Sequence, residues 1–134
     1  MFGKSFMVAL FSVVFVAFVG CGGSHSSPEN AAESAAKLIF DNKIPEFLKE
    51  LRTVDGREFS SDESELIGGK ISMSVAGVKM QGEIASIKAQ EVEYSGDKQS
   101  AKVPVKITLK DGRDDNIPFD VKLFDGKWYV VLEF

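Results

Sequence analysis

The fold of this chain is decided by residues 100–134, which read SAKVPVKITL (100–109), KDGRDDN (110–116), IPFDVKLF (117–124), DG (125–126) and KWYVVLEF (127–134). Apolar and polar residues alternate over 100–109, 117–124 and 128–134, and this alternation predicts three β-strands. Asp-Gly turns separate them, and Asp-Gly strongly favours tight hairpins. A fourth alternating run, 88–94, precedes another turn at Ser95-Gly96-Asp97. The sequence therefore predicts a four-stranded antiparallel meander.

One face of this predicted sheet is apolar. Its members are Ala101, Val103, Val105, Ile107, Leu109, Ile117, Phe119, Val121, Leu123, Trp128, Val130, Leu132 and Phe134. Phe124, Tyr129 and Val131 fall on the opposite face, where aromatic residues could contact a partner or a second copy of the chain. Pro104 and Pro118 cannot donate a ladder hydrogen bond, so we expect them at an edge, a bulge or a strand end.

Two N-terminal helices are predicted to cover the apolar face. The first begins with Ser27 as the cap and Pro28 at the first helical position. Its apolar face consists of Ala32, Ala35, Ala36, Ile39 and Phe40. A shorter second helix begins near Pro45 and turns Phe47, Leu48 and Leu51 inward. Helices packed on one face of an antiparallel sheet define an α+β fold.

Residues 62–82 fit either a helix or a strand. Ile67, Ile71, Val75 and Val78 have helical spacing, whereas Ile71, Met73 and Val75 also alternate as in a strand. Four glycines in or after this stretch (Gly68, Gly69, Gly77 and Gly82) would each weaken a helix by about 1 kcal/mol. We favour a helix loosened by glycines and keep the strand as the alternative.

Helices followed by a curved meander resemble a group of small bacterial lipoproteins of unknown function. These proteins have a cystatin-like, nuclear-transport-factor-like α+β fold, and the resemblance covers residues 28–134. It rests on Ser27-Pro28-Glu29 with its Ala-rich helix, Val92-Glu93-Tyr94-Ser95-Gly96-Asp97, Lys110-Asp111-Gly112 and Asp125-Gly126-Lys127-Trp128. The resemblance implies the fold and assigns no functional residue.

The N-terminus has the pattern of an export signal. Lys4 precedes an apolar run over residues 6–19 that is too short to span a bilayer comfortably, as in a signal peptide. Gly20-Cys21 resembles the lipobox of bacterial lipoproteins, which implies cleavage before Cys21 and a lipid on its thiol. We therefore expect a signal peptide over 1–20, a lipidated flexible tether over 21–27 and one domain over 28–134. An ordinary signal peptide or an uncleaved anchor remains the alternative.

Composition argues against several functional classes. Without residues 1–20 the chain keeps 15 Lys and Arg against 20 Asp and Glu, because Lys4 is the only charged residue lost. A net negative chain disfavours nucleic acid as a partner. The acidic turn around Asp111 and Asp114 lacks the ligand spacing of a calcium loop, so no metal or other cofactor is predicted.

No catalytic motif is present in the sequence. His25 is the only histidine and lies in the predicted tether, where we expect a solvated ring without an orienting partner. No serine occupies a Gly-x-Ser-x-Gly elbow, and Asp120 alternates outward with Lys122. We therefore predict that the protein is not an enzyme.

A pocket between the sheet and the helices is the candidate site. The residues expected to line it are Phe40, Phe47, Val105, Phe119, Trp128 and Val130. Tyr94 and Tyr129 could supply polar contacts to a small apolar ligand. The alternative is that these large side chains fill the core completely.

The sequence thus predicts a membrane-anchored lipoprotein with a non-catalytic binding or accessory domain facing the periplasm. Its partners would be the membrane, through the lipid, and a small apolar ligand or a protein. Gly22 follows the cysteine where Asp would signal retention in enteric bacteria, which favours the outer membrane. A small-pocket enzyme and a dimerising interaction module, of undetermined oligomeric state, are the alternatives.

Replacing the predicted acceptor tests the anchor directly. Cys21→Ala should abolish lipid attachment and leave an unprocessed precursor, because Cys21 is the only cysteine. Labelling cells with an alkynyl fatty acid measures the attachment. Labelling of the mutant, or its absence from the wild type, would contradict the lipoprotein interpretation.

Overall fold

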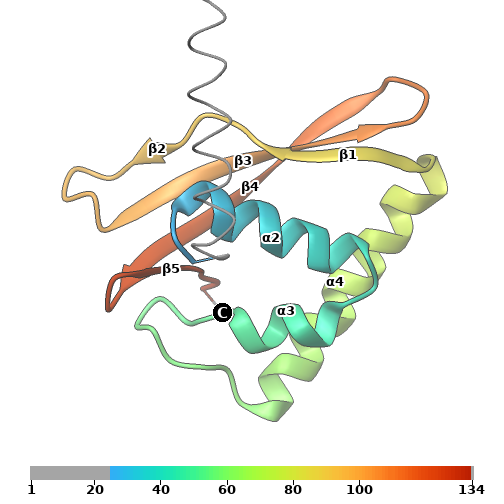
Figure 1. Ribbon diagram of the computed structural model, residues 1–134. Coiled ribbons are helices and arrows are strands. Elements are labelled where there is room, and N and C mark those ends of the chain that lie inside the picture. The colour runs from blue at the N-terminus through green and yellow to red at the C-terminus, as the bar shows by residue number, and fades with distance from the viewer. Residues whose placement is uncertain (1–24, 134) are drawn as a thin grey trace, which may run out of the picture.

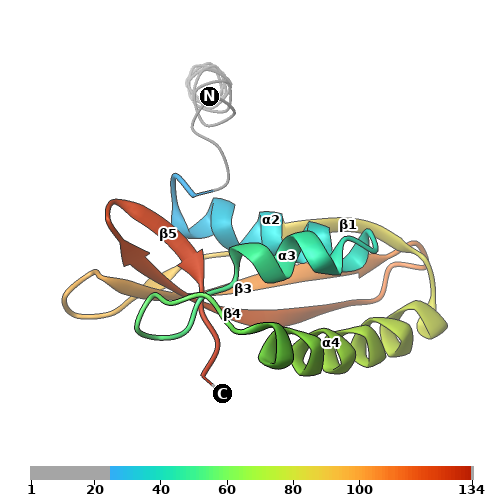
Figure 2. The same cartoon turned by 90° about the horizontal axis from the view of Figure 1, so that it is seen from below.

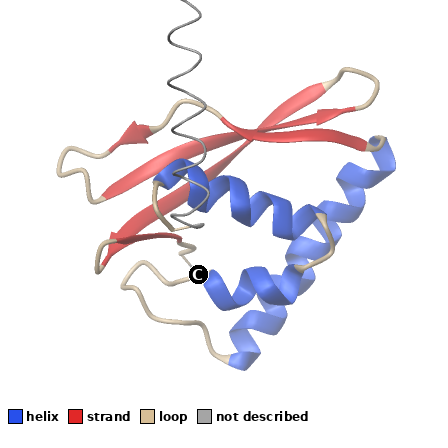
Figure 3. Ribbon diagram, viewed as in Figure 1, coloured by secondary structure: helices blue, strands red, loops and turns tan. Residues whose placement is uncertain are grey.

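The computed structural model describes residues 25–133, and Cys21 and Phe134 lie outside them. Three helices precede five strands (Figures 1 and 3). They are α2 (Pro28–Phe40), α3 (Ile44–Glu50), α4 (Ser61–Gln81), β1 (Ile84–Ala89), β2 (Glu93–Tyr94), β3 (Ser100–Leu109), β4 (Asp114–Phe124) and β5 (Lys127–Val130). The predicted α+β class is confirmed, and the ambiguous stretch is a helix.

Serine side chains begin the two long helices. Ser27 Oγ accepts a hydrogen bond from the backbone N–H of Asn30 at 3.1 Å. At α4, Ser60 Oγ accepts from the N–H of Glu63, and the Glu63 carboxylate accepts from the N–H of Ser60. Hydrogen bonding of the Glu63 carboxylate to the Ser60 backbone N–H, and secondarily to the Ser60 side chain, lowers the pKa of the Glu63 carboxyl. The contribution of the ionised Glu63 carboxylate to folding stability is therefore complete above the ordinary carboxyl pKa. It is lost as the pH falls through the lowered pKa of the folded state.

The sheet is antiparallel throughout, with the order β1-β3-β4-β5. Only the two ends of the predicted strand 88–94 are strand, because β1 begins earlier, at Ile84, and stops at Ala89, and β2 covers only Glu93–Tyr94. Both β1 and β2 pair with β3. Ala89 pairs with Val105 and Glu93 with Lys102, so three residues of the first segment face two of β3. An extra residue of this kind bends a strand and increases its twist.

The two strand prolines sit where no ladder donor is needed. Pro104 and Pro118 pair with each other across β3 and β4. The carbonyl of Pro104 points the other way and accepts from Gln90, at the break between β1 and β2. The backbone nitrogen of Pro118 points away from β3, at a part of the β4 edge that β5 does not reach. Both placements confirm the expectation that the prolines occur at a bulge or an edge.

All three helices lie on one side of the sheet (Figure 1), and α4 is the outermost, on the side of β4 (Figure 2). Helix α2 packs against β1, β3, β4 and β5. Ala32 and Ala36 of α2 are fully buried, as are Val103, Val105 and Val121 of the sheet. The core therefore lies between the alanine face of α2 and the two central strands.

The predicted alternation fails at the C-terminus. Val131, expected on the open face, is buried, whereas Leu132, expected in the core, is 38% exposed. Strand β5 ends at Val130, and the next residues run between β4 and the segment after α3. Val131 donates to the Asp120 carbonyl at 2.9 Å, and Leu132 to that of Arg52 at 3.1 Å. Val131 is therefore held between two neighbouring segments, and its side chain is buried.

The open face of the sheet carries cross-strand ion pairs. Lys102 Nζ lies 3.8 Å from a carboxylate oxygen of Asp120, and Lys106 Nζ lies 3.9 Å from one of Asp114. These side chains are about half exposed, so each pair contributes little to stability. Within residues 25–133, no helix combines the length and apolar character needed to cross a bilayer.

Trp128 faces the helices as predicted, with 9% of its surface exposed and its ring 6.1 Å edge-on from that of Tyr94. Trp128→Ala should cost about 3–5 kcal/mol of unfolding free energy, because it leaves a large cavity. Denaturant unfolding followed by circular dichroism measures this loss. Leu132→Ala is the control and should cost much less. Red-shifted, easily quenched emission from the native wild type would contradict the burial of the ring.

Candidate binding cavity

A cavity of about 470 Å³ lies between α4 and the rest of the domain. From α4 it is lined by Ile67, Lys70, Ile71, Ser74, Val75 and Val78. From α2, α3 and the residue after it, the lining is Ile39, Phe40, Phe47 and Leu51. The sheet and the C-terminal segment contribute Ile117, Pro118, Phe119, Asp120, Val130, Val131, Leu132 and Glu133.

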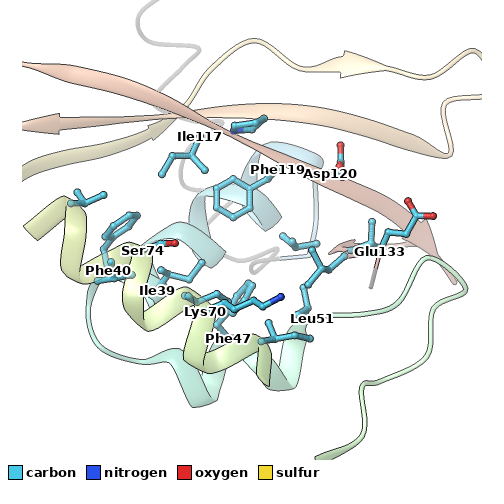
Figure 4. Close-up of a pocket in the computed structure, with 18 residues that line it drawn as sticks. Ile39, Phe40, Phe47, Leu51, Lys70, Ser74, Ile117, Phe119, Asp120 and Glu133 are labelled. Atoms are coloured by element: carbon cyan, nitrogen blue, oxygen red, sulfur yellow. The ribbon is translucent and has the colours of Figure 1, made fainter. Parts of the chain in front are cut away.

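The cavity arises from the way α4 is supported. Helix α4 packs mainly on α3 and, more weakly, on α2. Gly68 allows this close contact, because a Cβ there would lie 3.2 Å from a methyl carbon of Leu48. With α4 held by the other helices, space remains between it and the outer part of β4. Phe119 points from the sheet into this space (Figure 4).

Few polar side chains border the cavity. Lys70 and Ser74 are one helical turn apart on α4, so they share its inner wall. The carboxylate of Asp120 points away from the cavity (Figure 4) and lies 3.8 Å from Lys102 Nζ on the open sheet face. Glu133 lies at the C-terminal rim. The wall is therefore mainly apolar, with an ammonium and a hydroxyl on one side.

Four of the six residues expected to line a pocket do line this cavity: Phe40, Phe47, Phe119 and Val130. Val105 and Trp128 lie elsewhere in the core, Val105 fully buried and Trp128 beside Tyr94. The lining residues of α4 were not predicted. Their helical spacing was visible, but nothing in the sequence placed that helix opposite Phe119 rather than Trp128.

Neither tyrosine expected to serve as a polar handle lines this cavity. Tyr94 is half exposed and borders a second depression of about 420 Å³, lined mainly by residues of β2, β3 and β4. Tyr129 packs beneath two side chains: its ring centre is 4.4 Å from that of His25 and 4.6 Å from the guanidinium carbon of Arg52. Cation–π contact with Arg52 stabilises this arrangement.

The expectation that His25 is solvated and without a partner is wrong. Its Nδ1 lies 2.7 Å from the Trp128 carbonyl oxygen, which can only accept, so Nδ1 carries the hydrogen. The backbone N–H of Trp128 donates to the His25 carbonyl at 3.0 Å, and Nε2 lies 3.7 Å from Glu50. The docked part of the chain thus begins no later than His25, before the predicted domain start at Pro28.

The carboxylates of the acidic turn between β3 and β4 pair with basic side chains of the chain itself. Asp111 accepts from the backbone N–H and from the side chain of Arg113, and these bonds, in that order, lower the pKa of the Asp111 carboxyl. Asp114 pairs with Lys106. No group of three or more potential metal ligands occurs among the described residues.

Comparison with known proteins identifies the fold. The structure matches the crystal structure of a Campylobacter jejuni protein that bears the provisional name NTF2-like transpeptidase. The TM-score is 0.64 at 22% sequence identity, over 81% of this chain and all of the other. No protein-family model matches the sequence, and no curated protein does. The domain therefore has the NTF2-like α+β fold.

Proposed function

We propose that this protein is a membrane-tethered, non-catalytic binding domain whose cavity accepts a small, mainly apolar molecule. The observation that carries the proposal is the cavity itself. Its volume of about 470 Å³ falls within the range of ligand sites, which are typically apolar with a few orienting polar groups. Lys70 on one wall favours a ligand that carries a negative charge at one end.

A small-pocket enzyme is the rival from another class. Nucleophilic catalysis by Ser74 would require a base within hydrogen-bonding reach of its hydroxyl. Among the described residues, no hydrogen bond joins Ser74 to another side chain, and the nearby Asp120 carboxylate faces the other side of the sheet. His25 is held by Trp128, which does not line the cavity. This arrangement favours binding over catalysis.

The N-terminal sequence supports the proposed tether. Cys21 stands four residues before the docked His25, so a lipid on its thiol would hold the domain close to a membrane surface, within the short reach of an extended segment. We propose attachment to the bacterial cell envelope with the domain facing the periplasm, on the outer rather than the inner membrane. An ordinary exported protein would have the same fold without the lipid.

Two related dyes test both the cavity and its charge. 1-Anilinonaphthalene-8-sulfonate and N-phenyl-1-naphthylamine share an apolar ring system, but only the first carries a sulfonate. We expect both to bind residues 25–134 with enhanced fluorescence. Lys70→Met should lower the affinity for the sulfonate dye about 2- to 5-fold, as expected for loss of an exposed ion pair. The affinity for the neutral dye should be unchanged.

A matched pair of variants shows where the dyes bind. Ile71→Phe adds a ring to the cavity wall and should lower the affinity for both dyes. Ala85→Phe adds the same ring at an exposed position of β1 outside the cavity and should leave the affinity for both dyes unchanged. Equal effects of the two variants, or no saturable binding of either dye, would refute the proposed function.

A further inference from the structure

Helix α4 has a second apolar face, directed away from the cavity. Leu66, Met73 and Met80 are 59%, 77% and 88% exposed, respectively. They recur every seven residues, the spacing that keeps side chains in line along a helix and marks the seam of paired helices. The inner face carries Ile67, Ile71, Val75 and Val78, which line the cavity. The packing of the domain itself therefore leaves these outer residues mostly exposed.

The glycines of α4 distinguish the two faces. Gly68 makes room for α3, and Gly82 ends the helix with φ of 156°. Gly69 and Gly77 have neither role, because an added Cβ would meet no described atom within 4 Å. Both lie between the large residues of the outer face. Glycine weakens a helix but permits another backbone to approach closely.

The outer face is symmetric about Met73. Leu66 and Met80 lie seven residues on either side of it, and Gly69 and Gly77 lie four residues on either side. A twofold interface brings the same patch of two copies together, so that each residue meets its symmetry counterpart. An antiparallel copy centred on Met73 would place Leu66 against Met80 and Gly69 against Gly77. We propose that a second copy of this chain docks here, through antiparallel pairing of the two α4 helices.

The charges of α4 fit the same arrangement. Asp62 and Glu65 lie in its first half, and Lys79 lies in its last turn. Antiparallel pairing sets Glu65 of each copy near Lys79 of the other, and it also opposes the two helix dipoles. Lys79 Nζ has only the neutral Asn42 oxygen as its hydrogen-bond partner among the described residues, at 3.2 Å. A parallel pair would instead bring like charges together.

The open sheet face, considered from the sequence as a contact surface, fits a partner less well. Its central residues Lys102 and Asp120 pair within the chain, and Tyr129 is engaged by His25 and Arg52. The outer face of α4 is instead apolar and unpaired within residues 25–133. This proposal does not depend on the cavity binding a ligand, because the cavity uses the inner face of the helix.

Cysteine cross-linking in the full-length chain tests the pairing. Met73→Cys puts a thiol on the twofold axis, opposite its own copy, so oxidation should yield a disulfide-linked dimer on non-reducing gels. Met80→Cys is the matched control, since Met80 is more exposed but lies about 21 Å along the helix from its own counterpart. A disulfide requires Cα atoms within about 7 Å. The wild type, with Cys21 as its only cysteine, gives the background.

Co-expression sharpens the test. Chains carrying Leu66→Cys and chains carrying Met80→Cys should cross-link with each other, and each should cross-link poorly when expressed by itself. Equal dimer yields from the Met73→Cys and Met80→Cys variants would indicate random collision and overturn the proposal. So would the absence of any dimer of the Met73→Cys variant, the outcome expected if a different protein or the membrane surface covers this face. Neither outcome would bear on the proposed ligand binding, because the cavity is lined by the inner face of α4.

Discussion

The rest of the structure depends on the close contact between the alanine face of α2 and the centre of the sheet. Ala32 and Ala36 have no exposed surface, and neither do the valines of β3 and β4 beneath them. Small side chains let the helix axis approach the strands, so α2 takes the middle position and contacts the four strands of the meander. Helices α3 and α4 must then pack beside α2 rather than over the sheet. The cavity is the space that this displacement leaves between α4 and the outer half of β4.

The backbone of β4 helps to define what can enter that space. In the β3–β4 register, the even-numbered residues of β4 point their backbone groups away from β3. The Asp120 carbonyl, for example, accepts from the N–H of Val131 on the other side. Beyond the end of β5 this edge could pair with an extended peptide. Pro118 offers no donor there, and the N–H of Asn116 already donates to the Asp115 carboxylate at 2.9 Å. The edge is thus protected against strand addition, which favours a compact ligand held by side chains.

Most of the fold could be predicted because local patterns determine it. Alternation and Asp-Gly turns located β3, β4 and β5, and the Ser27 cap followed by Pro28 located the start of α2. Prediction failed where distant segments decide the outcome. Val131 lies between Arg52 and β4 through backbone pairing, and Trp128 fixes His25 through its own backbone. Neither arrangement leaves a signal in the sequence. The cavity was predicted only in part, for the same reason. Phe119 and Phe47 belong to clear apolar faces, whereas the opposing wall depends on where α4 packs.

Helix α4 was ambiguous in the sequence because it carries apolar residues on opposite sides. A helix with a single buried face shows one clear stripe, whereas Ile71, Met73 and Val75 follow one another in alternation because Met73 faces outward between two inward residues. The same pattern that imitates a strand therefore describes a helix with two contact surfaces. One surface borders the cavity, and the other is free for a partner. Because both belong to one rigid element supported mainly by α3, a partner that shifts α4 would also change the width of the cavity, and a ligand that fills the cavity would in turn reposition the outer face.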